Sequence, residues 1–191
     1  IVLTDAVITD CIPFTCGGHS KIYKGTINIK GSVSKRVVVK YLTNSFDAEG
    51  ENEVRFAKER ITHPNIAEIF SAESTPHGTY VCMPVYERHL ASLIYSTDPI
   101  SDRIRLMNEM IAAISHLHNN SFVHRDIKPE NIMLTPQRGV VLIDFSLSGP
   151  VQPGKVEVFV AHTEWYRGPE YSFFEMNDPM KADLWALGMT L

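Results

Sequence analysis

The stretch His124-Arg125-Asp126-Ile127-Lys128-Pro129-Glu130-Asn131 decides how the rest of the sequence is interpreted. It brings a carboxylate, two basic groups and a carboxamide into one short polar segment. A lone aspartate in a loop is more often a turn cap than a reactive group. A catalytic role for Asp126 therefore depends on support from other segments of the sequence. Four of these stand in a fixed order around it: Val37-Val38-Val39-Lys40 upstream, then Ile143-Asp144-Phe145-Ser146, Gly168-Pro169-Glu170 and Asp183-Leu184-Trp185-Ala186-Leu187-Gly188 downstream.

Each of these segments resembles a motif of eukaryotic protein kinases, and together they cover essentially the whole chain. The central one matches the pattern H-R-D-x-K-x-x-N at every fixed position. The resemblance implies an α+β, bilobal protein kinase-like fold with nucleotide between the lobes. We expect one kinase domain over 1–191, with a β-rich N-lobe carrying one main helix at 1–85 and a mainly helical, partial C-lobe at 86–191. Because the family has further helices after the Asp-x-Trp-x-x-Gly segment, a C-terminally incomplete domain is expected.

Composition narrows the class of protein. The chain has 191 residues and 44% hydrophobic residues, enough for a sizeable core. Its 18 basic and 22 acidic residues give a net charge of −4, which argues against nucleic acid as a partner. No apolar run approaches the length of a membrane span, so no membrane partner is expected. Three cysteines form no disulfide framework and favour an intracellular location, cytoplasmic or nuclear.

Periodicity predicts the main elements. Alternating or β-branched runs predict strands at 21–30, 36–42 and 79–83. Apolar residues at helical spacing predict an amphipathic helix over 48–61, which His63-Pro64-Asn65 should end. The same spacing predicts a long helix over 101–118, and two apolar runs predict a hairpin over 132–143.

The resemblance assigns chemistry to five polar residues. Asp126 would accept or orient the proton of the substrate hydroxyl, and Asn131 and Asp144 would bind Mg²⁺ through oxygen atoms. Lys128 and Thr163 stand where serine/threonine kinases carry these residue types. Taken alone, Lys128 would be a solvated surface charge.

Lys40 resembles the strand lysine that holds the α- and β-phosphates of ATP. Its expected partner is Glu53, which lies ten residues before His63-Pro64-Asn65-Ile66, a stretch similar to the family's H-P-N-I landmark. Glu51 is the competing assignment, half a helical turn out of phase.

The remaining nucleotide contacts rest on alignment with the family. The phosphate-covering loop keeps only the middle glycine of G-x-G-x-x-G, and glycine matters there because backbone N–H groups must approach phosphate closely. Met83 would be the gatekeeper, with the Pro84 carbonyl and the Tyr86 backbone binding the base, although the apolar residues also suit an ordinary strand core. The implied cofactor-binding residues are Thr15, Gly17, Gly18, Ser20, Ile22, Val38, Lys40, Met83, Pro84, Tyr86 and Met133.

Two departures from the family concern regulation. Ser146 replaces the glycine of D-F-G, and serine resists torsions that glycine allows. Glu157 falls near the place where an activating phosphate would pair with Arg125. We therefore expect one of two roles for Glu157. It either supplies a permanent negative charge in place of the activating phosphate, or it is an ordinary solvated glutamate.

The function implied is ATP-dependent phosphoryl transfer to serine or threonine hydroxyls of proteins, a transferase activity requiring ATP and Mg²⁺. The segment Thr163-Glu164-Trp165-Tyr166-Arg167-Gly168-Pro169-Glu170 resembles that of cyclin-dependent and mitogen-activated kinases. The partners expected are a protein substrate and, as an option, a regulatory subunit. The alternative is a pseudokinase that binds nucleotide or a partner without transfer. A small-molecule kinase is disfavoured by Lys128 and Thr163.

Overall fold

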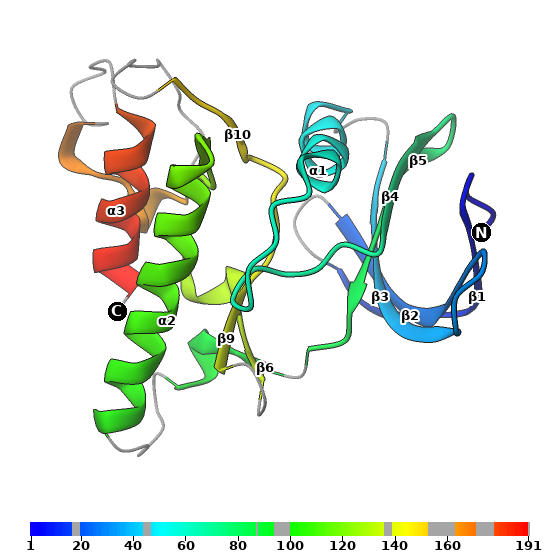
Figure 1. Cartoon of the computed structure of the whole chain (residues 1–191), viewed down its shortest axis with the longest axis horizontal. Coiled ribbons are helices and arrows are strands. Elements are labelled where there is room, and N and C mark those ends of the chain that lie inside the picture. Colours follow the sequence, from blue (N-terminus) through cyan, green and yellow to red (C-terminus); the bar gives the residue numbers. More distant parts are fainter. Residues whose placement is uncertain are drawn as a thin grey trace. The chain divides into compact units, whose positions relative to one another are not determined.

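The computed structural model describes residues 1–16, 20–43, 47–86, 88–93, 100–135, 139–152, 163–170 and 178–190. The chain divides into two compact units, each with its own core. The first comprises Ile1–Arg60 and Ala67–Val85, and the second comprises Ile61–Ile66 and Tyr86–Leu191. The first is rich in strands and the second in helix (Figure 1), so the predicted α+β class is confirmed.

The first unit is an antiparallel five-stranded sheet with one helix against it. The strand order is β1-β2-β3-β5-β4, and α1 contacts β3, β4 and β5. The strands predicted at 21–30, 36–42 and 79–83 correspond to β2, β3 and β5. The element bounds are β1 Ala6–Cys16, β2 Ser20–Ile29, β3 Lys35–Leu42, α1 Asp47–Glu59, β4 Ser71–Thr75 and β5 Gly78–Pro84.

Alternation along β3 directs its side chains to two different clusters. Val37 and Val39, both fully buried, belong to a core formed with β1 and β2. Val38 and Leu42 belong to a second cluster with Val81 of β5. Because side chains alternate along a strand, Lys40 shares the face of Val38 and Leu42.

The helix α1 ends earlier than the sequence predicted. Its last residue is Glu59, and Arg60 adopts a left-handed backbone with φ 53°. A residue in this conformation cannot continue a right-handed helix, so the helix stops before the proline at position 64 has any influence. The predicted helix over 48–61 is therefore correct in kind, but it starts one residue too late and ends two residues too late.

The short segment Ile61–Ile66 belongs to the second unit, which differs from a simple division after residue 85. The Asn65 carbonyl accepts a hydrogen bond from Leu142 N at 2.9 Å, and Asn65 Nδ2 donates to the Val140 carbonyl at 2.7 Å. Ile66 also forms a parallel bridge with Leu142. These backbone and amide bonds hold the segment against β9 (Gly139–Leu142).

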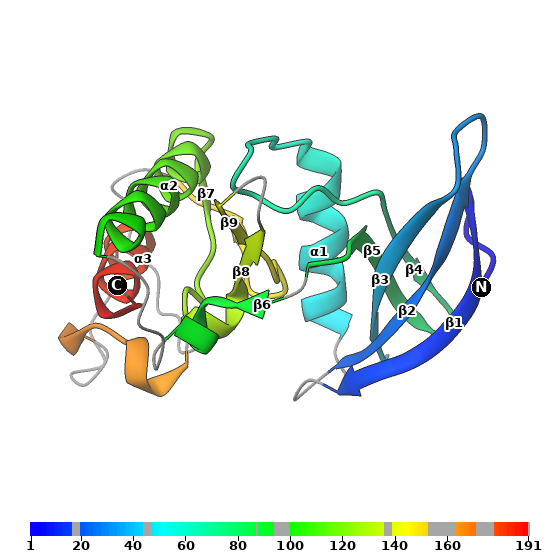
Figure 2. The same ribbon diagram turned by 90° about the horizontal axis from the view of Figure 1, so that it is seen from below.

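In the described part of the second unit, helices are combined with two small sheets (Figure 2). The helix predicted over 101–118 and the hairpin predicted over 132–143 are both present, as α2 and as β8 paired with β9. The other pairings are β6 with β8 and β7 with β10. The bounds are β6 Arg88–His89, η2 Leu90–Leu93, α2 Ile100–Asn119, β7 Phe122–Val123, η3 Pro129–Asn131, β8 Ile132–Thr135, β10 Gly149–Pro150, η4 Glu164–Tyr166 and α3 Pro179–Thr190.

The buried face of α2 carries Met110, Ala113, Ile114 and Leu117, none of which is exposed to solvent. Beside it on the same helix runs a second apolar stripe that stays exposed: Ile104, Met107 and Ile111. Among the helices that the structure describes, none has both the length and the apolar character needed to cross a membrane.

Candidate active site

A buried carboxylate fixes the backbone of the central segment. Asp183, on α3, accepts hydrogen bonds from His124 N at 2.9 Å and from Arg125 N at 2.8 Å. His118 Nε2, near the end of α2, lies 3.0 Å from the same carboxylate. Arg125 adopts a left-handed backbone with φ 65°, a conformation that non-glycine residues adopt only when their surroundings enforce it.

Asp183 is ionised in spite of its complete burial. Burial raises the pKa of this carboxyl, but the His118 hydrogen bond, the nearby His124 and its backbone N–H outweigh that effect. The resulting pKa lies below the ordinary aspartate value. Hydrogen bonds to a charged acceptor are stronger than those to a neutral one. The Asp183 carboxylate therefore fixes the backbone of the loop at His124 and Arg125.

The side chains of Asp126, Lys128 and Thr163 form a closed group of hydrogen bonds, called the Asp126 group below. Lys128 Nζ lies 2.7 Å from Asp126 Oδ2 and donates to Thr163 Oγ1 at 2.8 Å. Thr163 Oγ1 in turn donates to Asp126 Oδ1 at 2.8 Å, and Thr163 N lies 3.3 Å from the same oxygen. The structure therefore brings together three of the predicted site residues: Asp126, Lys128 and Thr163.

Asp126 carries a negative charge at neutral pH. Burial pushes the pKa of this carboxyl upward, but the hydrogen bond and charge of Lys128, with the Thr163 hydroxyl and His124, lower it below the ordinary value. An ionised carboxylate held by fixed donors can accept the hydrogen bond of an incoming hydroxyl group.

Asn131 is oriented by the same aspartate. Its Nδ2 donates to the Asp126 carbonyl at 2.8 Å and to Asp126 Oδ2 at 2.9 Å. Because Nδ2 makes both bonds, Oδ1 is the atom of Asn131 that could bind a cation. The Asn131 carbonyl also accepts a bond from Ile143 N at 2.9 Å, which ties η3 to the end of β9.

Asp144 is the next residue after Ile143, whose N–H donates to the Asn131 carbonyl. Its backbone is left-handed, with φ 66°, and its Oδ1 accepts a hydrogen bond from Ser146 Oγ at 2.7 Å. A carboxylate and an amide oxygen on adjacent segments fit Mg²⁺, which takes one or two protein oxygens and completes its shell with phosphate and water. The residues present therefore fit the predicted cation.

In the first unit, Lys40 and Glu53 form the predicted ion pair. Lys40 Nζ lies 2.7 Å from Glu53 Oε1, and the two side chains are 7% and 0% exposed. Glu51, the competing assignment, is exposed on the same helix. A buried lysine requires a charged partner, and α1 supplies it from the helix that covers this face of the sheet.

Several predicted nucleotide-binding residues of the first unit share the face of Lys40. Ile22 of β2 is directly opposite Lys40, and Met83 of β5 is directly opposite Val38. Cross-strand partners lie on the same side of a sheet, so all four side chains have a common direction.

The other predicted nucleotide contacts are distributed over the two units. Thr15 and Ser20 lie at the facing ends of β1 and β2, and Pro84 ends β5. Met133, on β8, and Tyr86 belong to the second unit. Gly17, Gly18 and Glu157 lie outside the described residues.

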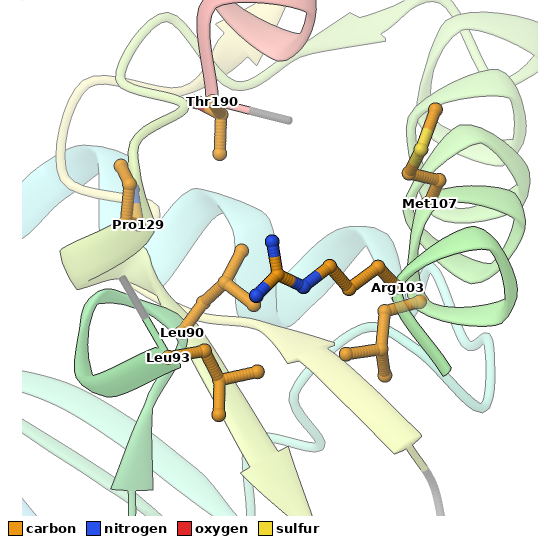
Figure 3. A pocket seen from close by; sticks show the side chains of 7 residues that line it. Leu90, Leu93, Arg103, Met107, Pro129 and Thr190 are labelled. Atoms are coloured by element: carbon orange, nitrogen blue, oxygen red, sulfur yellow. The ribbon is translucent and has the colours of Figure 1, made fainter. Parts of the chain in front are cut away.

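A cavity of about 160 Å³ lies beside η3 in the second unit (Figure 3). Arg103 extends from α2 into its middle, toward Leu90. The remaining lining residues are mostly apolar: Leu93, Leu106, Met107, Pro129 and Thr190. None of the predicted site residues that the structure describes is in this lining.

The sequence missed two residues that support the site. Asp183 lies in a motif to which the sequence assigns no role, and His118 lies at the end of the helix predicted over 101–118. The spacing Asp-x-Trp was the available signal for Asp183, but the partners of its carboxylate lie 58 and 59 residues away.

A family model described as "Protein kinase domain" matches residues 16–191. Sperm motility kinase 2B of Mus musculus is 32% identical over 135 residues, which is 68% of this chain and 27% of that protein. The probable serine/threonine-protein kinase MARK-C of Dictyostelium discoideum is 28% identical over 185 residues, 92% of this chain and 24% of that protein. The chain thus spans about a quarter of the length of these relatives.

Among solved structures, a chain of the CAK complex from Chaetomium thermophilum bound to ATP-gamma-S superposes with a TM-score of 0.80. Its sequence is 23% identical, and the match covers 97% of this chain and 60% of the other. At this identity, the likeness concerns the fold.

Proposed function

Because the chain belongs to the protein kinase domain family, we propose that it transfers the γ-phosphoryl group of ATP to serine or threonine hydroxyls of proteins. The observation that carries the proposal is the closed group of Asp126, Lys128 and Thr163, with Asn131 oriented by the same carboxylate. Residues 1–191 would form one kinase domain.

Each member of this group has a definite task in the proposed reaction. The Asp126 carboxylate accepts the hydrogen bond of the substrate hydroxyl and aligns its oxygen with the γ-phosphorus. As the new P–O bond forms and the bond to the leaving ADP breaks, the hydroxyl proton passes to Asp126. Lys128 stabilises the charge on the transferred phosphoryl oxygens, and Thr163 holds Lys128 and Asp126 in register.

Asn131 and Asp144 would hold Mg²⁺, which supplies positive charge to the phosphate oxygens when bound. In the first unit, Lys40 would bind the α- and β-phosphates, and Glu53 would orient its ammonium group. The covering loop would contribute Thr15, Gly17, Gly18 and Ser20. The base would contact Ile22, Val38, Met83 and Met133 and receive hydrogen bonds from the backbone of Pro84 and Tyr86.

The partners proposed are protein substrates, since relatives such as MARK-C are named serine/threonine-protein kinases. A regulatory subunit is a further proposed partner, because the matching structure is that of a complex. The second candidate function is nucleotide binding without transfer. The hydrogen-bonded Asp126 group disfavours it, because a scaffold that only binds nucleotide has no need of an ionised, oriented carboxylate.

The test is transfer of labelled γ-phosphate to a generic basic protein by the wild type, Asp126→Asn and Asp178→Asn. We expect Asp126→Asn to reduce the rate by a factor on the order of 10² to 10⁴, as for loss of a general base. Asp178 lies at the start of α3, outside the group, and its variant should retain the wild-type rate. Transfer that survives in Asp126→Asn would remove this residue from its role. ATP binding without transfer by the wild type would favour the second candidate.

A further inference from the structure

Ser146 occupies the place where the family usually has glycine, and its hydroxyl has a specific partner. Ser146 Oγ donates to Asp144 Oδ1 at 2.7 Å, and Ser146 N lies 3.3 Å from the same oxygen. Two donors from one residue therefore converge on one oxygen of the carboxylate proposed to bind the cation. Glycine at this position would supply only the weaker, backbone contact.

The backbone of this segment is held independently of the Ser146 hydroxyl. Ser148 donates to the Phe145 carbonyl through both N, at 3.1 Å, and Oγ, at 2.6 Å. The Phe145 ring is 1% exposed and packs edge-on against His124, with ring centroids 5.2 Å apart. Arg125 Nη1 donates to the Leu147 carbonyl at 3.3 Å. The Ser146 hydroxyl is therefore not needed for the chain path, and its bond acts on the carboxylate.

Serine fits this position without backbone strain. Among the described non-glycine residues, Asp144 has a positive φ but Ser146 does not. A left-handed backbone is the conformation that favours glycine, so the backbone at Ser146 does not require it. Alanine and threonine should consequently be tolerated, which makes the hydroxyl testable by itself.

We propose that Ser146 is a positioning residue that holds the Asp144 carboxylate in the rotamer that binds the nucleotide-associated divalent cation. This inference rests on the proposed function. A half-buried aspartate such as Asp144 can adopt several rotamers. The hydrogen bond from Ser146 Oγ favours one of them before the cation binds. Hydrogen-bond partners of metal ligands typically change metal affinity by 10- to 100-fold when removed.

The choice of cation provides a readout that a purely structural role would not change. Mg²⁺ requires near-ideal octahedral geometry, whereas Ca²⁺ accepts 6 to 8 oxygens in flexible arrangements. A carboxylate freed from Ser146 should therefore harm Mg²⁺ binding more than Ca²⁺ binding. The ratio of the two affinities reports the orientation of Asp144 rather than the stability of the fold.

The experiment measures the affinity of the chain for a fluorescent, non-hydrolysable ATP analogue at buffered free Mg²⁺ or Ca²⁺. For Ser146→Ala we expect the half-saturating Mg²⁺ concentration to rise about ten-fold and that of Ca²⁺ to rise less than about three-fold. Ser146→Thr keeps the hydroxyl and should restore the wild-type Mg²⁺ value. Ser148→Ala is the matched control, since it removes a fully buried hydroxyl of the same segment. It should lower the unfolding temperature and leave the Mg²⁺ value unchanged.

Each outcome bears on one proposal. If the wild type shows no Mg²⁺-dependent binding, the proposed function fails and the inference falls with it. If the wild type shows it and Ser146→Ala has the same half-saturating Mg²⁺ concentration, only the inference is overturned. Equal losses for Mg²⁺ and Ca²⁺, or equal losses in Ser146→Ala and Ser148→Ala, would also overturn it, because they indicate a general structural effect.

Discussion

Replacing Asp183 by asparagine should destabilise the second unit by about 3 kcal/mol. The carboxylate accepts from three donors: Oδ2 from His118 and His124 N, and Oδ1 from Arg125 N. Asparagine has the same shape but only one oxygen. In its better orientation the amide nitrogen faces the Arg125 N–H, and a buried donor left unsatisfied costs about 1–3 kcal/mol. The two remaining bonds lose the contribution of the charge, which adds about 1 kcal/mol.

Equilibrium unfolding in urea, followed by tryptophan fluorescence, measures this loss. Trp165 and Trp185 are the two tryptophans of the chain, and both belong to the second unit. The matched control is Asp178→Asn, which changes the carboxylate that accepts from Met180 N at the start of the same helix. Asparagine caps helices about as well as aspartate, so the control should lose less than about 0.5 kcal/mol.

The result that would refute this reasoning is a loss below about 1 kcal/mol for Asp183→Asn, or equal losses in the two variants. Either would mean that the backbone N–H groups of the loop find other acceptors. A changed denaturant slope would indicate a different unfolded or native state, and the comparison would then use variants with the wild-type slope.

Three further predictions concern the ion pair, the threonine and pH. Glu53→Gln should cost about 3–5 kcal/mol, because it removes the charge that pairs with the buried Lys40 ammonium group. The thermal midpoint measures this, and Glu51→Gln on the exposed face should change it little. Thr163→Val should lower kcat about ten-fold by removing a hydrogen bond to a charged group, whereas Thr163→Ser should stay near the wild type in the transfer assay. The pKa of Asp183 is lowered on folding, so its ionised form contributes stability above the ordinary pKa, near 3.9. The wild type should lose this contribution as pH falls below about 4, and its advantage over Asp183→Asn in urea titrations should shrink only there.

Local patterns predicted three strands and the helix of the first unit, but not β1 or β4. The strand predicted at 36–42 contains Lys40, and the helix predicted over 48–61 contains Glu53. The ion pair between them was expected from the resemblance to the kinase family, because the pattern of each element alone does not show which side chains of the other element it meets. Roles in nucleotide binding, including those of Gly17 and Gly18, remain predictions.

Patterns could not tell which of two apolar stripes on α2 is buried. Ile111 and Met110 are neighbours in the sequence, yet the first is 46% exposed and the second is fully buried. Burial depends on which elements pack against the helix, and those lie far away in the sequence. The same reason hid the link between Asp183 and the central loop. The bond from Ser146 to Asp144 was equally invisible, because the sequence shows a replaced glycine but not the direction of the new hydroxyl.

The attachment of Ile61–Ile66 to β9 has a consequence for synthesis of the chain. Asn65 Nδ2 and the Val140 carbonyl that accepts from it are 75 residues apart in the sequence. On a ribosome, the strap formed by residues 61–66 leaves the exit tunnel long before its partner strand exists. The first unit can complete its sheet once β5 has emerged, but residues 61–66 cannot form their bonds to β9 until that strand has been synthesised. A fragment cut after Val85 would therefore carry Ile66, 2% exposed in the whole chain, as a bare apolar side chain.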